Sequence, residues 1–239
     1  MQQIDMERIE LADIHLQIRR ACHDLNAPLR AARGFADILR QREAANLSER
    51  GALYLQRMVA VTEQMAQVVD GLHHYARLST YHCIVEELAI VPSLQRHLAT
   101  LYPQEIAVGQ LRCVGEAELL WVADKRLIQV AVGELVANGL RFHNEQQLPQ
   151  VLVSFVVVDG ALNITVTDNG IGIAEEYQQQ IFNLFERLHN REHYSGAGVG
   201  LTLVLKAVQL LRGTIAMESA EGEGAVVTIT LPQLTVGGA

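Results

Sequence analysis

Apolar side chains recur at helical spacing over the first third of the chain. Between residues 4 and 43 they follow a three- and four-residue repeat, which predicts an amphipathic helix. A second such repeat covers residues 53–75, and the segment 44–48 between the two predicts a turn in which Ser48 caps the second helix. Pro28 interrupts the first repeat, so we expect a kink or a local opening of that helix.

Two long helices joined by a short turn form an antiparallel hairpin. One hairpin has too little surface to bury both of its apolar stripes, so we expect two copies of the chain to pair into a four-helix bundle. The helical repeat ends near residue 79, which predicts a helical dimerisation domain over residues 1–79.

The pattern changes to a mixture of strands and helices after a hinge at residues 79–83. We expect helices over residues 92–101, 126–142 and 199–211, and strands over 119–122, 151–158, 162–167, 215–217 and 225–231. Asp159-Gly160, between two of these strands, is a strong hairpin signal. The pattern predicts a sheet layered with helices over residues 84–239, and an α+β fold class for the whole chain.

Composition narrows the class of protein. The 239 residues carry a formal net charge of −8, which argues against a nucleic-acid-binding surface because such surfaces are usually basic. No apolar run approaches the ~20 residues needed to cross a bilayer, and no basic-then-apolar leader opens the chain. Cys22, Cys83 and Cys113 are odd in number and lack metal-ligand spacing, so we interpret them as reduced thiols of a soluble, cytoplasmic protein.

The first helical segment carries a histidine beside a carboxylate, His23 and Asp24, one turn before Pro28. Imidazole is a usable nucleophile at physiological pH because its reference pKa is about 6.5. Such a nucleophile needs one ring nitrogen free and the other hydrogen-bonded, and a neighbouring carboxylate can hold the ring in that tautomer. On its own, the pair would be interpreted as two solvated surface residues.

Three polar residues share one face of the helix predicted over 126–142. Glu134, Asn138 and Arg141 stand at i, i+4 and i+7. Carboxylate and amide oxygens suit Mg²⁺, which prefers a few protein oxygens together with phosphate oxygens and water. An arginine meets phosphate as a fixed cation. A polar helix face in water is the alternative interpretation of this pattern.

Two glycine clusters follow, each beside a predicted element. The first comes directly after the strand that ends at Asp168, and the second directly before the last helix. Their members are Gly170 and Gly172 in the first cluster, and Gly196, Gly198 and Gly200, followed by Leu201, in the second. Glycines let a backbone approach a ligand closely, and N–H groups at a helix start suit phosphate oxygens. Each cluster alone would be a weak signal.

In this order and at these distances, the segments resemble the H-box, N-box, G1 box and G2 box of sensor histidine kinases. The wording around His23 (His-Asp-Leu-x-x-Pro-Leu-Arg) and before the second glycine cluster (Phe-x-Arg-Leu-His) looks most like the phytochrome-type branch. The resemblance extends from about Ile14 to Pro232. It implies a two-helix dimerisation and phosphoacceptor domain, followed by an α/β sandwich of the Bergerat ATP-binding type.

The resemblance also implies roles for single residues. His23 would accept the γ-phosphoryl group of ATP, and Asp24 would orient its ring. Glu134 and Asn138 would hold Mg²⁺, although the family more often has Asn where Glu134 stands. Asp168 would accept the amino group of adenine.

Further residues would surround the nucleotide. Arg141, Arg187 and Arg191 would contact its phosphates, the last two from a mobile lid between the glycine clusters. The two clusters themselves and Leu201 complete the nucleotide-binding set. Ala197 stands where Thr is commoner in the family, which removes a hydroxyl near the phosphates and is expected to weaken binding of the nucleotide.

Partners follow from the same resemblance. A phosphorylated His23 would pass its phosphoryl group to an aspartate on a response-regulator receiver domain, a partner that is absent from this chain. The input signal would come from a separate sensory domain or subunit. Ala27 stands one helical turn after His23, where many members have Thr or Asn to position water for dephosphorylating the regulator, so we expect weak phosphatase activity.

Two other interpretations compete with an ATP-dependent histidine autokinase. One is a catalytically weak phosphotransfer or scaffold protein derived from a kinase; such a protein would be expected to lose the Asn, Asp and glycine residues that this chain keeps. The other is an ATPase similar to gyrase or Hsp90. That class has no use for a histidine within a two-helix hairpin.

Overall fold

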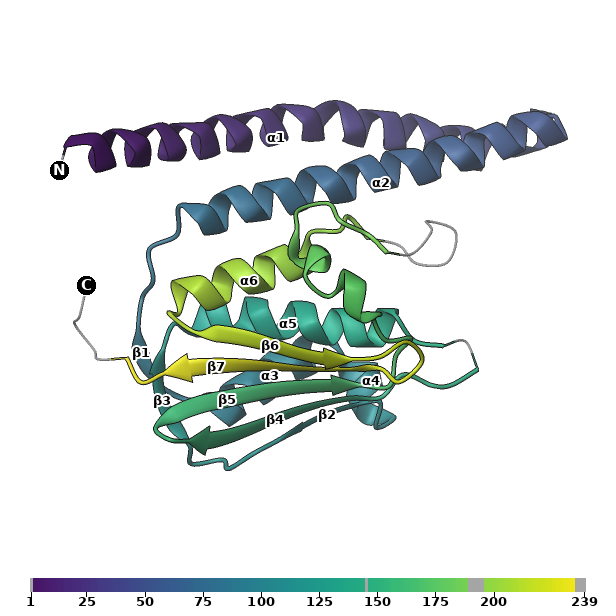
Figure 1. Ribbon diagram of the computed structural model, residues 1–239. Coiled ribbons are helices and arrows are strands. Elements are labelled where there is room, and N and C mark those ends of the chain that lie inside the picture. Colours follow the sequence, from purple (N-terminus) through teal and green to yellow (C-terminus); the bar gives the residue numbers. More distant parts are fainter. Residues whose placement is uncertain (1, 145, 189–195, 235–239) are drawn as a thin grey trace. The chain divides into compact units, whose positions relative to one another are not determined.

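The computed structural model describes residues 2–144, 146–188 and 196–234. Contacts divide the chain into two compact units, Met1–Tyr81 with Arg191–Val199, and His82–Asn190 with Gly200–Ala239. The first is built on two long helices and the second on a sheet with helices, as the ribbon shows (Figure 1). The predicted α+β class is confirmed.

The first unit is the predicted helical hairpin. Helix α1 spans Gln2–Arg42, a short 3₁₀ turn covers Ala44–Asn46, and α2 spans Glu49–Ser79. Ser48 is the N-cap of α2, as predicted: the backbone N–H of Gly51 donates to its hydroxyl oxygen at 3.1 Å.

Helix α1 continues on both sides of Pro28. The kink or opening expected there therefore does not end the helix. Proline has no N–H to donate to the carbonyl four residues earlier, which is that of Asp24. The helix thus has one potential hydrogen bond fewer at the turn that follows His23.

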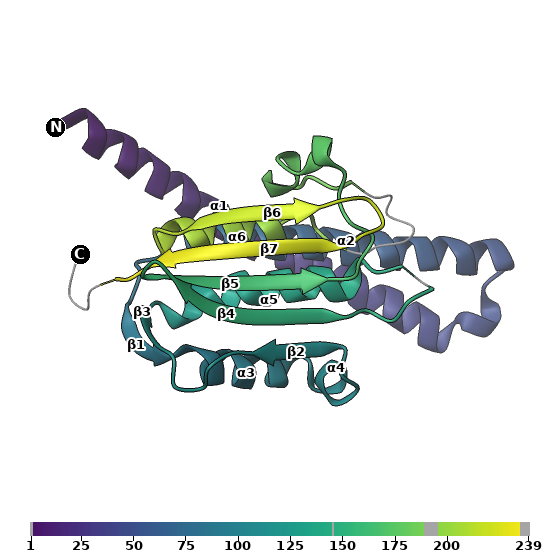
Figure 2. The ribbon, with the colours of Figure 1, turned by 60° about the horizontal axis from the view of Figure 1, so that its bottom comes forward.

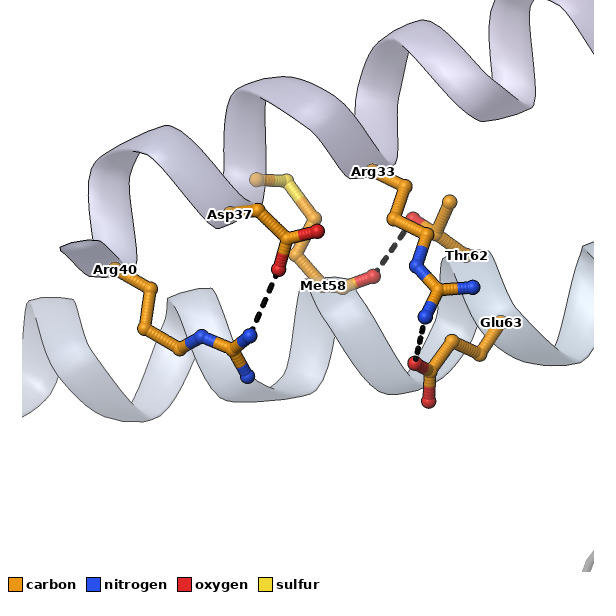
Figure 3. Close-up of polar contacts among 6 residues, drawn as sticks. All are labelled: Arg33, Asp37, Arg40, Met58, Thr62 and Glu63. Carbon is orange, nitrogen blue, oxygen red and sulfur yellow. Dashed lines mark hydrogen bonds and ion pairs between the residues drawn. The ribbon is translucent and has the colours of Figure 1, made fainter.

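Small and apolar side chains form the seam between the two helices. The buried residues of the hairpin include Cys22, Ala36, Leu55, Val69, Ala76, Leu78 and Thr62, whose hydroxyl donates to the carbonyl of Met58 at 2.8 Å. An ion pair joins the helices at 3.3 Å, between Arg33 Nη2 and Glu63 Oε1 (Figure 3). The two side chains are 57% and 45% exposed, so solvent screens the pair and its contribution is at most about 1 kcal/mol.

Much of the apolar surface of the hairpin is not covered within one chain. Large apolar side chains at least a third exposed are Ile14, Leu16, Leu25, Phe35, Ile38 and Leu39 on α1, and Leu53, Tyr54, Met58, Val61 and Met65 on α2. Exposed apolar patches of this extent mark interaction surfaces. The exposure agrees with the expectation that a single hairpin cannot bury both stripes.

The second unit is a two-layer sandwich. Its strands are β1 Glu86–Ala89, β2 Leu111–Val114, β3 Leu120–Ala123, β4 Val151–Val158, β5 Ala161–Asp168, β6 Thr214–Ser219 and β7 Ala225–Pro232. Five of them form a sheet in the order β2-β4-β5-β7-β6, parallel only between β2 and β4, while β1 and β3 form a separate antiparallel pair. The Asp159-Gly160 turn has positive φ at both residues, 51° and 75°, as a tight β-hairpin requires.

Helices cover one face of the five-stranded sheet. They are α3 Ile90–Leu101, α5 Lys125–Arg141 and α6 Gly200–Leu210, which lie behind the strands in Figure 2, with the short α4 Pro103–Ala107 and the 3₁₀ turns Glu175–Tyr177 and Gln180–Phe182 at the periphery. Alternate residues of β5 and β7 are buried beneath them, among them Ile164 and Ile229. The opposite face is rich in threonine, and Thr165 and Thr228 hydrogen-bond across it at 3.2 Å.

Asp124 joins three segments of this unit and is only 1% exposed. Its Oδ1 accepts from the backbone N–H groups of Arg126 at 2.9 Å and Leu127 at 3.1 Å, which caps α5. Its Oδ2 accepts from the N–H of Ile84, 40 residues earlier, at 2.6 Å. One buried carboxylate therefore starts the central helix and fastens the segment that enters the sheet domain.

The predicted elements recur with shifted ends. Helix α3 begins at Ile90, two residues before Pro92, and α6 begins at Gly200. Three short elements, β1, β2 and α4, were not expected from the sequence pattern; each is four or five residues long. Elements this short show too few residues for a period to be recognised.

Replacing Asp124 by Ala is expected to destabilise the sheet domain by roughly 2 to 3 kcal/mol, because it removes the cap of α5 and leaves the N–H of Ile84 unpaired. Urea unfolding of the full chain, followed by the fluorescence of Trp121, measures this, since Trp121 is the single tryptophan and is 5% exposed. Asp124→Asn, which keeps one acceptor oxygen, should lie between wild type and Asp124→Ala. The exposed Glu87→Ala serves as the control; equal midpoints for Asp124→Ala and the control contradict the prediction.

Candidate functional site

His23 stands on α1 with its side chain 87% exposed, and the neighbouring Asp24 is 81% exposed. The Nδ1 atom of His23 lies 3.3 Å from Oδ1 of Asp24. At this distance Nδ1–H donates a weak hydrogen bond to the carboxylate, which favours the tautomer with a free lone pair on Nε2. An exposed, oriented imidazole is the chemistry that a phosphoryl acceptor needs.

Cys22 and Ala27, which lie on either side of His23 in the sequence, differ in their exposure to solvent. Cys22 is buried in the seam with α2, and burial, assisted by the negative charge of Asp70, raises the pKa of its thiol. The thiol therefore stays protonated at neutral pH. Ala27, one turn after His23, is exposed and offers only a methyl group.

In the sheet domain, the start of α6 approaches the predicted polar face of α5. A Cβ built on Gly200 would lie 2.7 Å from Oε2 of Glu134 and 3.8 Å from Nδ2 of Asn138. A larger residue there would require the end of the flexible Glu134 side chain to move. The structure thus brings Gly200 close to Glu134 and Asn138, from which it is separated by more than 60 residues in the sequence.

Arg141, the third residue of that face, ends α5 and is exposed. Its guanidinium carbon lies 6.0 Å from the centre of the Phe142 ring. Burial and the negative charge of Glu134 raise the pKa of Tyr102, while the positive charge of Arg141 opposes that shift. Tyr102 therefore lies in the electrostatic field of this helix face, which sequence reasoning missed because the tyrosine precedes the helix by more than 20 residues.

Asp168 ends β5 and is half-buried. Its Oδ1 accepts from the N–H of Gly170 at 2.8 Å and from the N–H of Ala225 at 3.2 Å. Burial raises the pKa of this carboxyl group, and the two hydrogen bonds act against the rise. Both bonds engage the same oxygen, so the lone pairs of Oδ2 are available to a ligand that can donate.

The glycines after Asp168 are dictated by close backbone contacts. Gly170 lies against the carbonyl of Phe142, where a Cβ would come within 2.3 Å of the oxygen. Gly172 has a φ of 67° and faces the carbonyl of Ala220, where a Cβ would come within 1.8 Å. The Gly222 N–H also donates to the Ile171 carbonyl at 2.7 Å. The first glycine cluster therefore packs between the end of α5 and the β6–β7 turn.

Gly139 is a further residue that sequence reasoning did not assign. A Cβ on it would lie 2.9 Å from the Cβ of Asp168 and 2.9 Å from Val151. The glycine lets α5 approach the end of β5, so that Asn138 and Asp168 border the same region. Its position directly after Asn138 was the available signal, but its partner on β5 follows only from the fold.

The second glycine cluster leads into α6. Gly196 and Gly198 have φ values of 146° and 70°, conformations that favour glycine. Gly200 opens α6, and Leu201 lies half-buried in its first turn. The hydroxyl of Thr202 donates to the carbonyl of Phe182 at 3.0 Å, which ties α6 to the preceding 3₁₀ turn.

Arg187 lies half-buried in the loop after that turn. Its contact with phosphate stays a prediction. Arg191, the other arginine predicted for the lid, lies outside the described residues.

Glu134 and Asn138 fit a magnesium ion in their chemistry, since both carry oxygen and share one helix face beside the glycine that opens α6. A half-turn of the Asn138 side-chain amide would bring its oxygen to the side of Gly200. Across the residues whose side chains are described, no group of three His, Cys, Asp or Glu residues is placed to hold a metal. Two protein oxygens suit an ion that is completed by nucleotide phosphates and water.

None of the helices formed by the described residues is both long enough and apolar enough to cross a bilayer.

Two family models match the chain. Residues 15–80 match the His Kinase A (phospho-acceptor) domain, and residues 123–235 match the histidine kinase-, DNA gyrase B- and HSP90-like ATPase. The first match contains His23, and the second contains the α5 face and both glycine clusters.

Relatives match across both units. The phytochrome-like protein Cph1 of Synechocystis is 28% identical over 89% of this chain, which corresponds to 28% of Cph1. The histidine protein kinase DivJ of Caulobacter vibrioides is 33% identical over 89% of this chain, which corresponds to 36% of DivJ. The chain thus spans about a third of the length of these curated relatives.

A crystal structure of full-length ShkA in complex with AMPPNP matches 92% of this chain and 46% of that one, with a TM-score of 0.68 and 21% identity. This likeness supports the fold. Because a phosphoacceptor model and an ATPase model match in the expected order, and curated histidine kinases align across both, the chain belongs to the sensor histidine kinases and contains the catalytic core of that family, with phytochrome-like proteins among its relatives.

Proposed function

We propose that this core transfers the γ-phosphoryl group of ATP to His23 and then to an aspartate of a response-regulator receiver domain. The observation that carries the proposal is the state of His23, whose ring is exposed and whose Nδ1 is 3.3 Å from the Asp24 carboxylate. Exposure admits a second domain to the ring. The hydrogen bond leaves Nε2 as the nucleophile.

Phosphoryl transfer to His23 forms one bond to the γ-phosphorus and breaks another. The lone pair of Nε2 forms a bond to the γ-phosphorus while the bond from that phosphorus to the bridging oxygen breaks, and its electron pair leaves on ADP. Nδ1 keeps its proton and the ring becomes positively charged, which the Asp24 carboxylate stabilises. The receiver aspartate would then attack phosphorus, break the N–P bond and return a neutral imidazole.

Adenine recognition is assigned to Asp168. Gly170 and Ala225 occupy one carboxylate oxygen, so the second can accept from the exocyclic amino group of adenine. Guanine presents a carbonyl at the equivalent position, which would face a carboxylate without a proton between them. The phosphates are assigned to the glycines before α6, to the helix start and to Arg141 and Arg187.

Magnesium is assigned to Glu134 and Asn138, which face the backbone of Gly200. When bound, the ion would neutralise charge on the β- and γ-phosphates. The chain itself contributes mainly position and fixed charge, as is usual for phosphoryl transfer.

Assembly forms part of the same proposal. The exposed apolar residues of α1 and α2 support a homodimer in which two hairpins form a four-helix bundle. The domain limits are proposed as residues 1–79 for dimerisation and phosphoacceptance, and 84–239 for catalysis. The proposal places the core in the cytoplasm and takes its input from a separate sensory domain or subunit.

Wild-type protein incubated with γ-labelled ATP and Mg²⁺ is expected to acquire an acid-labile, alkali-stable label. His23→Ala should lose that label while it keeps its affinity for ATP, because Glu134, Asn138 and Asp168 belong to the other unit. His74→Ala, which changes another exposed histidine of the hairpin, should label as wild type. Equal labelling of His23→Ala and wild type would contradict the assignment.

Substitutions in the nucleotide site should separate metal binding from base recognition. Asn138→Ala is expected to weaken Mg²⁺-dependent ATP binding by about 2 kcal/mol, roughly 30-fold, because a ligand to a charged group is lost. Asp168→Asn should erode the preference for ATP over GTP, since its amide donor would face the amino group of adenine. Calorimetry with both nucleotides decides, with Asn163→Thr on the threonine-rich face as control; unchanged ATP affinity in both variants rejects the site.

Phosphatase activity toward the regulator is expected to be weak, because Ala27 has no side-chain group that can position water. Ala27→Thr or Ala27→Asn should raise the rate of phosphate release from a purified phospho-regulator by about tenfold, equivalent to about 1.4 kcal/mol of barrier. Ala31→Thr, one turn further along α1, controls for the effect of threonine on the helix. Strong phosphatase activity in the unmodified chain would show that another group positions the water.

A further inference from the structure

Two arginines precede His23 by one turn of α1. Arg20 stands at i−3 and Arg19 at i−4, the two positions whose side chains neighbour that of His23 on the helix surface. Long and aromatic side chains in helices lean toward the N-terminus and lie over the preceding turn. Arg19 and Arg20 therefore belong to the turn over which a long side chain at position 23 would extend.

The two guanidinium groups have different surroundings. Arg20 is exposed, and in the described part of the chain no carboxylate forms an ion pair with it. Arg19 is half-buried, and its Nε is buried without a hydrogen-bond partner among described residues. Burial lowers the pKa of His73 on α2, and the positive charges of Arg77, His74 and, to a smaller extent, Arg19 add to this lowering. Arg19 is thus turned toward the helix seam, while Arg20 stays on the solvent face with His23.

Asp24 is the carboxylate within one turn of Arg20 on α1. It follows Arg20 by four residues, a spacing that permits an ion pair, yet it pairs with Nδ1 of His23. On the other side of His23, Asn26 and Ala27 at i+3 and i+4 are uncharged. Arg30, at i+7, is about 10 Å further along the axis. The positive charge next to His23 is therefore concentrated on its N-terminal side.

A phosphoryl group on Nε2 would bring two negative charges to this turn and three oxygens that accept hydrogen bonds. We propose that Arg20 is a positioning residue for phosphohistidine: its guanidinium pairs with the phosphoryl oxygens on His23, and Arg19 adds a second positive charge behind it. The inference rests on the proposed function of His23. It adds an anion subsite on α1 itself, distinct from the arginines of the nucleotide site.

The pairing has a measurable consequence, because Arg20 gains a partner only when His23 is phosphorylated. It therefore shifts the equilibrium between His23 with ATP and phospho-His23 with ADP toward the phosphorylated form. Charge-assisted hydrogen bonds are stronger than neutral ones, but solvent and salt screen an exposed pair. Loss of Arg20 should lower this equilibrium constant by roughly three- to tenfold at low ionic strength.

The experiment uses the full chain with Mg²⁺ and labelled ATP, titrated with ADP, and measures the label on His23 at equilibrium. Arg20→Gln is compared with Arg57→Gln, which removes the same charge from an exposed position on α2. Arg20→Lys keeps the charge without the planar fork and should recover part of the loss. Calorimetry checks that the affinities of Arg20→Gln for ATP and ADP equal those of wild type.

The expected result is a lower equilibrium constant for Arg20→Gln only, with a deficit that shrinks as potassium chloride is raised. An equilibrium constant for Arg20→Gln equal to that of Arg57→Gln overturns the inference and leaves the autokinase proposal intact. A deficit that salt does not change, or that Arg20→Lys does not reduce, also overturns it, because it would indicate a structural effect. A wild-type chain that acquires no label rejects both proposals.

Discussion

The carboxylate of Asp168 fixes the geometry on which the nucleotide site depends. One of its oxygens receives N–H groups from Gly170 and Ala225, so the end of β5, the first glycine cluster and the start of β7 are held by a single acceptor. The Cβ of Asp168 in turn sets how near α5 can come, and Gly139 is the residue that permits the approach. Moving this carboxylate would displace the loop, the helix and the β6–β7 turn together.

The glycine region around Asp168 is closely packed, whereas the surroundings of His23 are exposed to solvent. The nucleotide region excludes side-chain atoms where backbones meet: a Cβ at Gly170, Gly172 or Gly200 would collide with a carbonyl or a carboxylate. Its groups are therefore in place before a ligand arrives, which reduces the entropy lost on binding. The surroundings of His23 are the reverse, since its ring is exposed and has one hydrogen bond, to Asp24.

Local signals in the sequence were enough for much of this architecture. The Ser48 cap, the Asp159-Gly160 turn and the long amphipathic repeats each depend on neighbours within a few residues, and all three occur in the structure as predicted. The face shared by Glu134 and Asn138 follows from helical spacing alone. Its closeness to Gly200 was expected only from the family resemblance.

Long-range contacts account for what was missed. The bond from Ile84 to Asp124 joins residues 40 positions apart, and the packing of Gly139 on Asp168 requires the register of β5 against the helix layer. Strand β2 is four residues long and its parallel partner β4 begins 40 residues later, so no local period could reveal it. Such features are chosen by the assembled core.

Pro28 has a consequence for how the phosphoacceptor turn moves. Since it cannot donate to the carbonyl of Asp24, opening α1 next to His23 breaks one hydrogen bond fewer than opening the same length of helix elsewhere. A backbone hydrogen bond contributes about 1 kcal/mol net, which corresponds to a roughly fivefold larger population of locally opened states. In amide hydrogen exchange, the N–H groups around this turn would lose their protection sooner than those in the middle of α2. His23, the proposed phosphoacceptor, is thus carried by a turn of α1 that opens more easily than a fully hydrogen-bonded turn.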